Sequence, residues 1–201
     1  MIAIIDYGLG NVQAFKDVYK RLNKPALIAR SSKDLANASK LILPGVGSFD
    51  YAIKKLDESG MRKYIEDLVI DKKIPVLGVC VGMQMLAKSS EEGKLNGLGW
   101  IDAIVKRFES ANGIILPHMG WNNVNPKSYG GLYKKTKEDL KFYFLHSYYF
   151  DAFEESDVEA TANYDGEYVC SVRKGNIFGV QFHPEKSHHF GMQLLKNFSE
   201  I

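Results

Sequence analysis

The stretch VLGVCVGMQML (residues 76–86) places Cys80 between Gly78 and Gly82, where an apolar run gives way to a helical pattern. This arrangement is typical of a nucleophile elbow, in which the reactive residue sits on a sharp turn and small flanking residues prevent clashes. The N-terminus of the following helix would then favour a thiolate and bind a developing oxyanion. The alternative is a core thiol packed among Val79, Val81 and Met83, so the rest of the chain has to decide.

Composition restricts the class of protein. The chain has 201 residues, of which 45% are hydrophobic and 25% are charged, as in globular proteins, and this length favours one domain. A net charge of +2 gives no reason to expect a nucleic-acid or anionic-membrane partner. No apolar run reaches the ~18 residues of a membrane span, and MIAIIDYGLGN has no basic region typical of a signal peptide. Two cysteines are too few for a secreted disulfide framework, which favours the cytoplasm.

The order of apolar patterns predicts an α/β fold. In the first half, short apolar strands expected at 2–6, 25–30, 40–45 and 75–80 alternate with helical patterns at 11–22, 50–71 and 82–89. Strands buried on both faces with helices between them indicate a parallel sheet. The second half is rich in aromatic and β-branched residues, with strands expected at 100–108, 142–150, 158–165, 168–175 and 176–183, and a closing helix at 188–201. RKGN between the last two strands predicts a hairpin. We find no repeat or linker and expect one domain, 1–201, with a mixed sheet.

Two glycine-rich turns follow predicted strands. GLGN (8–11) lies where a dinucleotide fingerprint would sit, but the third glycine of that fingerprint is replaced by Gln13. A tight strand-to-helix turn that faces a partner is the better interpretation. In LPGVGSF (43–49), the N–H groups of Gly45-Val46-Gly47 could face an anion, and an ordinary glycine turn is the alternative.

A nucleophilic thiolate needs a base and a proton donor. The best candidate is His183 in GVQFHPEKS (179–187), at the end of an apolar strand, with Glu185 placed to orient its imidazole. A metal site built from His183, His188 and His189 matches no known ligand spacing, so we predict neither metal nor cofactor. Cys170, inside YVCSV, lacks glycine flanks and a nearby base and is predicted to be a packed thiol.

Six segments occur in an order that resembles one family. DYGLGN, LPGVGSF, GVCVGMQML, LPHMGWN, FLHSYYF and GVQFHPEKS, which together extend over essentially the whole chain, resemble the class I (triad) glutamine amidotransferases. The closest likeness is to the HisH family, the glutaminase subunits of imidazole glycerol phosphate synthase. The resemblance implies a three-layer α/β/α class I glutamine amidotransferase fold with a mixed, mostly parallel central sheet, and no cofactor.

The resemblance also implies a mechanism. The Cys80 thiolate attacks the side-chain amide carbon of L-glutamine, and His183, oriented by Glu185, protonates the departing ammonia before water hydrolyses the thioester. The family positions that bind the oxyanion correspond to Gly45, Val46 and Val81. Those that hold the amino-acid end of glutamine correspond to Gly47, Gln84, Ser147 and Tyr148.

A partner is implied because no segment resembles an ammonia-acceptor site. Free ammonia is mostly protonated in neutral water, so it has to reach its acceptor through a shielded passage. In the family the partner is a (β/α)₈-barrel cyclase, which forms a heterodimer with the glutaminase. The matching interface positions are Asn11, His118, Met119, Gly120, Trp121, Asn122 and Lys186. A core aromatic at Trp121 and a free surface lysine at Lys186 are the alternatives.

Other functions remain open at this point. Val81, where relatives more often have Ile or Leu, and the segments LGWIDAIVKRF and EKSHHFG resemble a paralogous branch that supplies ammonia to a nucleotide-sugar amidotransferase. A cysteine hydrolase or peptidase on a related fold would not need Gln84 and Ser147–Tyr148. A non-catalytic scaffold that only docks its partner would not need all three of Cys80, His183 and Glu185. The leading interpretation is therefore the glutaminase subunit that supplies ammonia in histidine biosynthesis.

Overall fold

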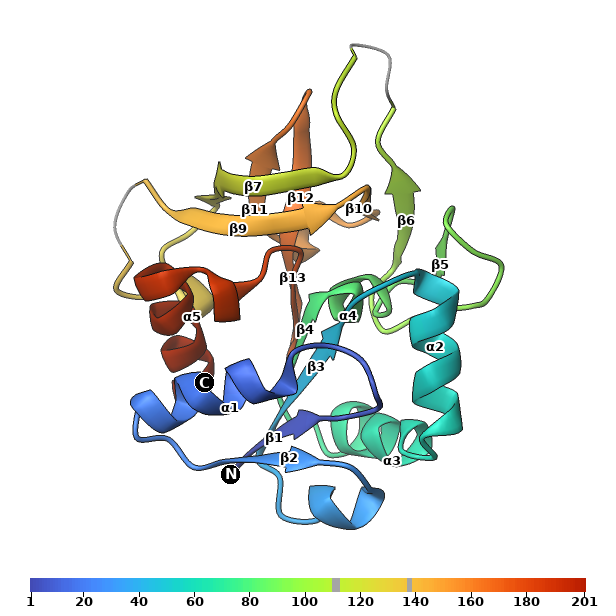
Figure 1. The fold of residues 1–201 in the computed structure, drawn as a ribbon, viewed down its shortest axis with the longest axis vertical. Helices are drawn as coiled ribbons and strands as arrows, with labels where there is room; N and C mark the ends of the chain where they lie inside the picture. Colours follow the sequence, from blue (N-terminus) through green and yellow to red (C-terminus); the bar gives the residue numbers. More distant parts are fainter. Residues whose placement is uncertain (110–112, 137–138) are drawn as a thin grey trace.

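The computed structural model describes residues 1–109, 113–136 and 139–201, and Figure 1 shows a central sheet between two layers of helices. The main sheet has eleven strands, nine of them in the order β2-β1-β3-β4-β13-β12-β10-β6-β5, with β11 paired to β12 and β8 paired to β11. The parallel part consists of β2 (Ala26–Ala29), β1 (Ile2–Ile5), β3 (Lys40–Gly45), β4 (Val76–Cys80) and β13 (Ile177–Val180). The remaining strands are β12 (Glu167–Lys174), β10 (Tyr148–Ala152), β6 (Ala103–Arg107), β5 (Ser89–Ser90), β11 (Val158–Asn163) and β8 (Asn125–Pro126).

Apart from the edge strand β2, which is only partly buried, the strands of the parallel part are buried almost throughout, as their continuous apolar runs predict. Strands β12 and β13 form the antiparallel hairpin predicted at RKGN, with its turn at Gly175–Asn176. This hairpin joins the parallel and antiparallel parts of the sheet. The predicted α/β fold with a mixed sheet is confirmed.

The helices lie on both faces of the sheet. They are α1 (Val12–Arg21), α2 (Phe49–Glu58), α3 (Arg62–Glu66) with the π-helical turn η2 (Asp67–Asp71), α4 (Val81–Gln84) and α5 (His188–Glu200). Short 3₁₀ turns are η1 (Ser32–Leu35), η3 (Gly131–Tyr133), η4 (Glu155–Asp157) and η5 (Pro184–Lys186). Because crossovers between parallel strands are right-handed, and β2 and β4 lie on opposite sides of the β1–β3 pair, α1 and α2–α3 cover opposite faces. Figure 1 shows α5 next to α1, which completes three layers.

A two-stranded ribbon lies apart from the main sheet. It pairs β7 (His118–Asn123) with β9 (Lys141–His146) in antiparallel register, and it lies above the carboxyl ends of the parallel strands in Figure 1. The sequence had not indicated β7. The predicted strand 142–150 is wrong as one element, because the chain leaves the ribbon at Ser147 and enters the main sheet as β10.

The helix predicted over 82–89 is also wrong beyond its first turn. Helix α4 ends at Gln84, and Ser89–Ser90 form β5 instead. The carbonyl oxygens of Met85, Leu86 and Ala87 accept backbone hydrogen bonds from Leu98, Ile101 and Gly99. These long-range bonds replace the helical ones, so a local helical pattern could not reveal them.

The described part of the chain contains no helix with the length and apolar content that a bilayer crossing requires.

Candidate active site

The candidate site lies at the carboxyl ends of the parallel strands, where ligands bind in open α/β sheets. Cys80 is the last residue of β4 and the N-cap of α4, with φ 55° and ψ −115°. A positive φ is uncommon for a residue other than glycine, and such strain clusters at functional sites. The strand, sharp turn and helix have the geometry of the nucleophile elbow.

The glycines on either side of Cys80 allow three backbone segments to meet. A Cβ on Gly78 would lie 2.6 Å from the carbonyl oxygen of Gly82, and a Cβ on Gly82 would overlap the carbonyl oxygen of Leu43. A Cβ on Gly45 would in turn meet the Val81–Gly82 peptide. Glycine is required at positions 45, 78 and 82 because β3, β4 and the first turn of α4 pack backbone against backbone.

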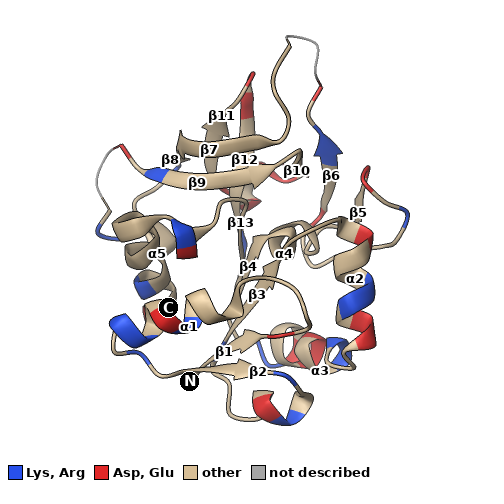
Figure 2. Ribbon diagram, viewed as in Figure 1, with Lys and Arg blue, Asp and Glu red and all other residues tan. Residues whose placement is uncertain are grey.

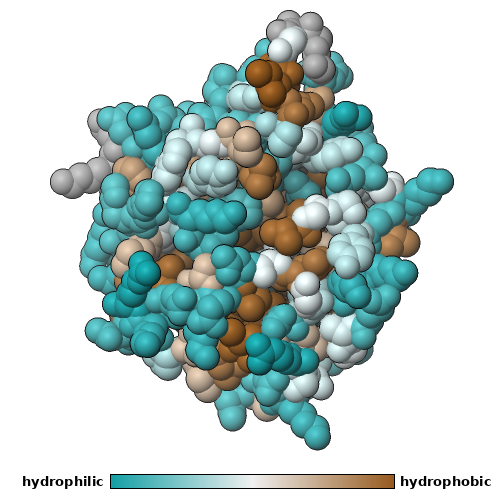
Figure 3. Space-filling model, in the orientation of Figure 1, coloured by the Kyte–Doolittle hydropathy of each residue, from teal (hydrophilic) through white to brown (hydrophobic). Residues whose placement is uncertain are grey.

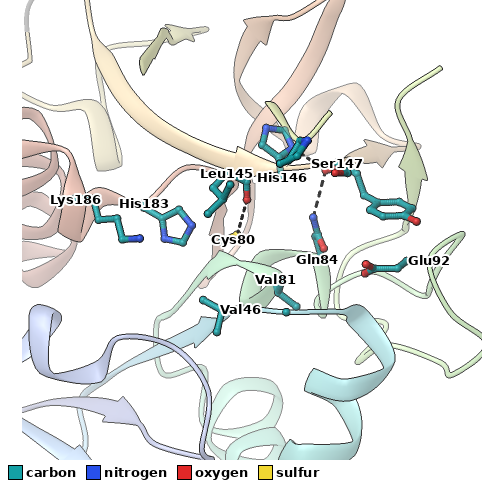
Figure 4. A pocket seen from close by; sticks show the side chains of 13 residues that line it. Val46, Cys80, Val81, Gln84, Glu92, Leu145, His146, Ser147, His183 and Lys186 are labelled. Atoms are coloured by element: carbon teal, nitrogen blue, oxygen red, sulfur yellow. Dashed lines mark hydrogen bonds between the residues drawn. The ribbon is translucent and has the colours of Figure 1, made fainter. Parts of the chain in front are cut away.

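His183 lies next to Cys80 (Figure 4), and Glu185 holds the His183 ring through a hydrogen bond. The Nδ1 atom of His183 is 2.8 Å from Oε1 of Glu185, and the two side chains are only 5% and 3% exposed. Since a carboxylate accepts, Nδ1–H donates, which leaves Nε2 for Cys80. Burial lowers the pKa of His183, but hydrogen bonds with Cys80 and Glu185 and the negative charges of both raise it by more. The net rise favours the protonated imidazolium, the form of His183 that can donate a proton.

A cavity of about 250 Å³ opens in front of Cys80. This is at the small end of ligand-pocket volumes and is suited to a molecule of amino-acid size. Its lining brings together most of the predicted site residues with several others: Val46, Gly47, Cys80, Val81, Gln84, Glu92, Pro117, Leu145, His146, Ser147, Tyr148, His183 and Lys186. Gly45 and Glu185 are not among the residues that line the cavity.

Glu92 is a lining residue that the sequence did not indicate. It lies in the loop after β5, and its Oε2 accepts a 2.7 Å hydrogen bond from the backbone N–H of Phe49, the first residue of α2. Figure 4 shows Glu92 on the opposite side of Cys80 from His183. Of the described residues that line the cavity, Glu92 is the one that carries a carboxylate.

His146 is a second lining residue that the sequence missed, and its ring belongs to a buried hydrogen-bond chain. Asn122 Nδ2 donates to His118 Nε2 (3.3 Å), so His118 Nδ1–H donates to His146 Nε2 (3.2 Å). His146 Nδ1–H then donates to the carbonyl oxygen of Tyr148 (2.8 Å). Burial lowers the pKa of His118 to about 4 and that of His146 to about 3, so both rings are neutral at pH 7.

Successive side chains of β7 point to opposite sides, so the predicted interface residues on this strand fall into an exposed group and a more buried group. Met119 and Trp121 point outward and are 66% and 47% exposed, whereas the His118 ring is buried at 4%. The His118 ring therefore faces the interior, and the interface role of this residue stays a prediction. Gly120 and Asn122 are partly exposed, and Asn11 and Lys186 lie on the surface.

The GLGN turn supports the PGVG segment. Tyr7 OH donates to the carbonyl oxygen of Pro44 (2.7 Å), and Gly10, with φ 87°, lies so close that a Cβ would be 2.7 Å from the Cβ of Pro44. Asn11 accepts from the N–H of Ala14 and begins α1. The tight-turn interpretation agrees with this packing.

A cysteine on an elbow, a histidine–glutamate pair beside it and a small cavity form an arrangement that suits acyl transfer from a small substrate. The family model for class-I glutamine amidotransferases matches residues 3–201, and the chain belongs to this family. Within it, the chain is similar over its full length to proteins named imidazole glycerol phosphate synthase subunit HisH. That of Bdellovibrio bacteriovorus is 56% identical over 204 residues and that of Leptospira interrogans is 51% identical, and all of each chain is covered.

A further relative, named subunit HisH 2, from Pseudomonas aeruginosa is 45% identical, again with both chains fully covered. Among solved structures, a glutamine amidotransferase superimposes with a TM-score of 0.77 at 21% identity and covers 100% of this chain and 99% of its own. Another glutamine amidotransferase, from Thermotoga maritima, gives a TM-score of 0.64 at 22% identity, with 92% of this chain and 75% of its own covered. These structures establish the three-layer class I glutamine amidotransferase fold.

Proposed function

We propose that this protein is the glutaminase subunit of imidazole glycerol phosphate synthase, that Cys80, His183 and Glu185 are its catalytic triad, and that it passes ammonia to a (β/α)₈-barrel cyclase in histidine biosynthesis. One observation supports the assignment of the triad. The His183–Glu185 pair lies beside the elbow cysteine, and Cys80 and His183 face a cavity of amino-acid size. The names of relatives 45–56% identical over the full length support the pathway.

The reaction follows from these positions. The Cys80 thiolate attacks the side-chain amide carbon of glutamine and forms a C–S bond, while the carbonyl oxygen becomes an oxyanion. The N–H groups of Val81 and of the Gly45–Val46 segment bind this oxyanion, each worth about 3 kcal/mol of barrier. The His183 imidazolium donates its proton to the amide nitrogen, the C–N bond breaks, and ammonia leaves. His183 then takes a proton from water, and the hydroxide displaces Cys80 from the thioester to give glutamate.

The other cavity residues suit the amino-acid end of glutamine. The Glu92 carboxylate, fixed by the N–H of Phe49, can pair with the α-ammonium group. Gly47, Gln84, Ser147 and Tyr148 also line the cavity, and the Gln84 amide is held by the Tyr148 carbonyl (3.3 Å). The substrate would thus lie between Glu92 and Cys80.

The outward face of the β7–β9 ribbon supports a partner that covers the cavity. Met119 pairs with Leu145 and Trp121 with Tyr143 across this face. Leu145 also lines the cavity, so the apolar face reaches the rim of the site. Strand β7 has no Lys, Arg, Asp or Glu, and β9 has one such residue, Lys141. Both strands are mostly tan in Figure 2, and Figure 3 shows apolar residues exposed along the middle of this side of the molecule. A partner docked here would close the cavity against water, and ammonia would stay unprotonated.

The continuous sheet supports treating residues 1–201 as one domain. Because Cys80 and Cys170 are both unpaired, we place the protein in the reducing cytoplasm.

The test is glutamate release from glutamine by the purified protein, mixed with a histidine-pathway cyclase and its nucleotide ligand. We expect strong stimulation that disappears in Cys80→Ala. If a folded protein whose Cys80 still reacts with a thiol label is not stimulated, the acceptor is different. The nucleotide-sugar amidotransferase suggested by the sequence would then be the partner to assay.

A further inference from the structure

We propose that Gln181 is a positioning residue for the nucleophile, which donates its amide N–H to the Cys80 sulfur and holds Gln84 with its amide oxygen. The inference rests on the proposed function, because it takes Cys80 as the nucleophile. Gln181 follows β13, lies two residues before His183 and is completely buried. Because β13 is the parallel neighbour of β4, with Val180 opposite Val79, Gln181 lies directly beside Cys80.

Two contacts of the Gln181 side chain connect the nucleophile with the glutamine-binding residues. Nε2 of Gln181 is 3.7 Å from Sγ of Cys80, a hydrogen-bond distance for sulfur. Oε1 of Gln181 accepts a 3.0 Å hydrogen bond from Nε2 of Gln84. The buried amide therefore touches both parts of the candidate site.

The orientation of the Gln181 amide is determined by its neighbours. A backbone carbonyl can only accept, so the carbonyl oxygen of Tyr148 requires that Gln84 present its NH₂ group. The same NH₂ group faces Gln181, which must therefore present its oxygen to Gln84. The NH₂ group of Gln181 is left to face the sulfur.

This N–H acts on the protonation state of Cys80. A hydrogen bond to the charged form of a group stabilises that form, so the Gln181 N–H favours the thiolate. The carbonyl oxygen of Leu145, 3.8 Å from Sγ on the ribbon, accepts from the S–H of the neutral thiol and is repelled by a thiolate. Without Gln181, His183 would remain, but it would oppose the Leu145 carbonyl without a second donor from the Gln181 amide.

A purely structural role for Gln181 predicts a different result. If the amide only satisfied Gln84, its loss would weaken glutamine binding and raise KM, and the reactivity of Cys80 without substrate would not change. The pH dependence of Cys80 alkylation separates the two roles, since it needs neither glutamine nor a partner.

The experiment measures the rate of iodoacetamide alkylation at the Cys80 peptide between pH 5 and pH 10 by mass spectrometry, on the full chain. Methionine in Gln181→Met has a similar volume and no amide. We expect the midpoint of the alkylation rate against pH to rise by about one pH unit, which means about tenfold less thiolate at pH values below the midpoint. Gln193→Met is the matched control, because Gln193 lies on α5 and hydrogen-bonds Asn197. Its midpoint should equal that of the wild type.

If Gln181→Met fails to fold, Gln181→Leu takes its place, because leucine also lacks the amide and adds no charge next to the sulfur. The same rise is expected there. A midpoint in either folded variant that stays within about 0.3 unit of the wild type overturns the role of Gln181. This failure is separate from that of the proposed function, which would show as wild-type protein without Cys80-dependent glutaminase activity in the presence of its partner.

Discussion

Replacing Gly78 by alanine tests the packing that forms the elbow. In the structure, a Cβ at this position would lie 2.6 Å from the carbonyl oxygen of Gly82, 2.9 Å from its carbonyl carbon and 2.9 Å from the Cα of Met83. All three atoms are backbone, so no side chain can rotate away. Because non-bonded heavy atoms prefer separations of about 3.5 Å, β4 and the first turn of α4 have to separate by about 0.5–1 Å.

This displacement changes both activity and stability. A misplacement of about 1 Å costs up to about 100-fold in rate, so we expect kcat to fall by about 10- to 100-fold. Overpacking should lower the free energy of unfolding by about 1–3 kcal/mol. The assays are partner-stimulated glutamate release and urea unfolding. Gly130→Ala is the control, because the nearest atom to its Cβ would be Ser128 Oγ at 3.8 Å, and both assays should match the wild type. Wild-type kcat in Gly78→Ala would refute the packing explanation.

Three further predictions concern the triad, the buried histidines and the ribbon. Glu185→Gln should lower kcat at least tenfold, because the charge that stabilises the His183 imidazolium is lost, and a fall of less than threefold in steady-state assays would contradict this role. Burial lowers the pKa values of His118 and His146 to about 4 and 3, whereas in the unfolded chain both have the ordinary histidine pKa of about 6.5. Below about pH 6.5 the unfolded chain therefore binds more protons than the folded chain. Stability should therefore fall as pH drops from about 6.5 towards 4, by up to about 3 kcal/mol per pH unit in urea unfolding, whereas a flat profile would contradict neutral buried rings. Trp121→Ala should weaken partner binding by about 2 kcal/mol in calorimetry, as for a central aromatic anchor, without changing unfolding, and unchanged affinity would exclude the ribbon as the interface.

The local motifs predicted the core of the site. The glycines around Cys80 and the His-Pro-Glu run at 183–185 are short in sequence, and each sits at the end of a strand that its own apolar pattern reveals. Because parallel strands end at the same edge, the two segments meet there. The alternation of buried strands and helices was sufficient for the fold class.

The remainder of the site depends on long-range contacts. Glu92 reaches the cavity only because Met85–Ala87 bond to the 98–101 segment and turn the chain away from a helix. His146 was within a predicted strand, but its burial follows from pairing with His118 on β7, a strand without a clear pattern in the sequence. The same pairing turns His118 inward and leaves Met119 and Trp121 outside. Gln181 looks like any polar residue near a strand end until its contact with Cys80 is seen.

The most direct test of the central claim is covalent trapping of the nucleophile. The protein, with its cyclase partner present, is treated with a diazoketone analogue of glutamine and analysed by peptide mass spectrometry. We predict one adduct, on Cys80, that glutamine suppresses by competition and that is absent in Cys80→Ser, while the buried Cys170 stays unmodified. An adduct on another residue, or activity that persists in Cys80→Ser, would contradict the assignment of Cys80 as the nucleophile.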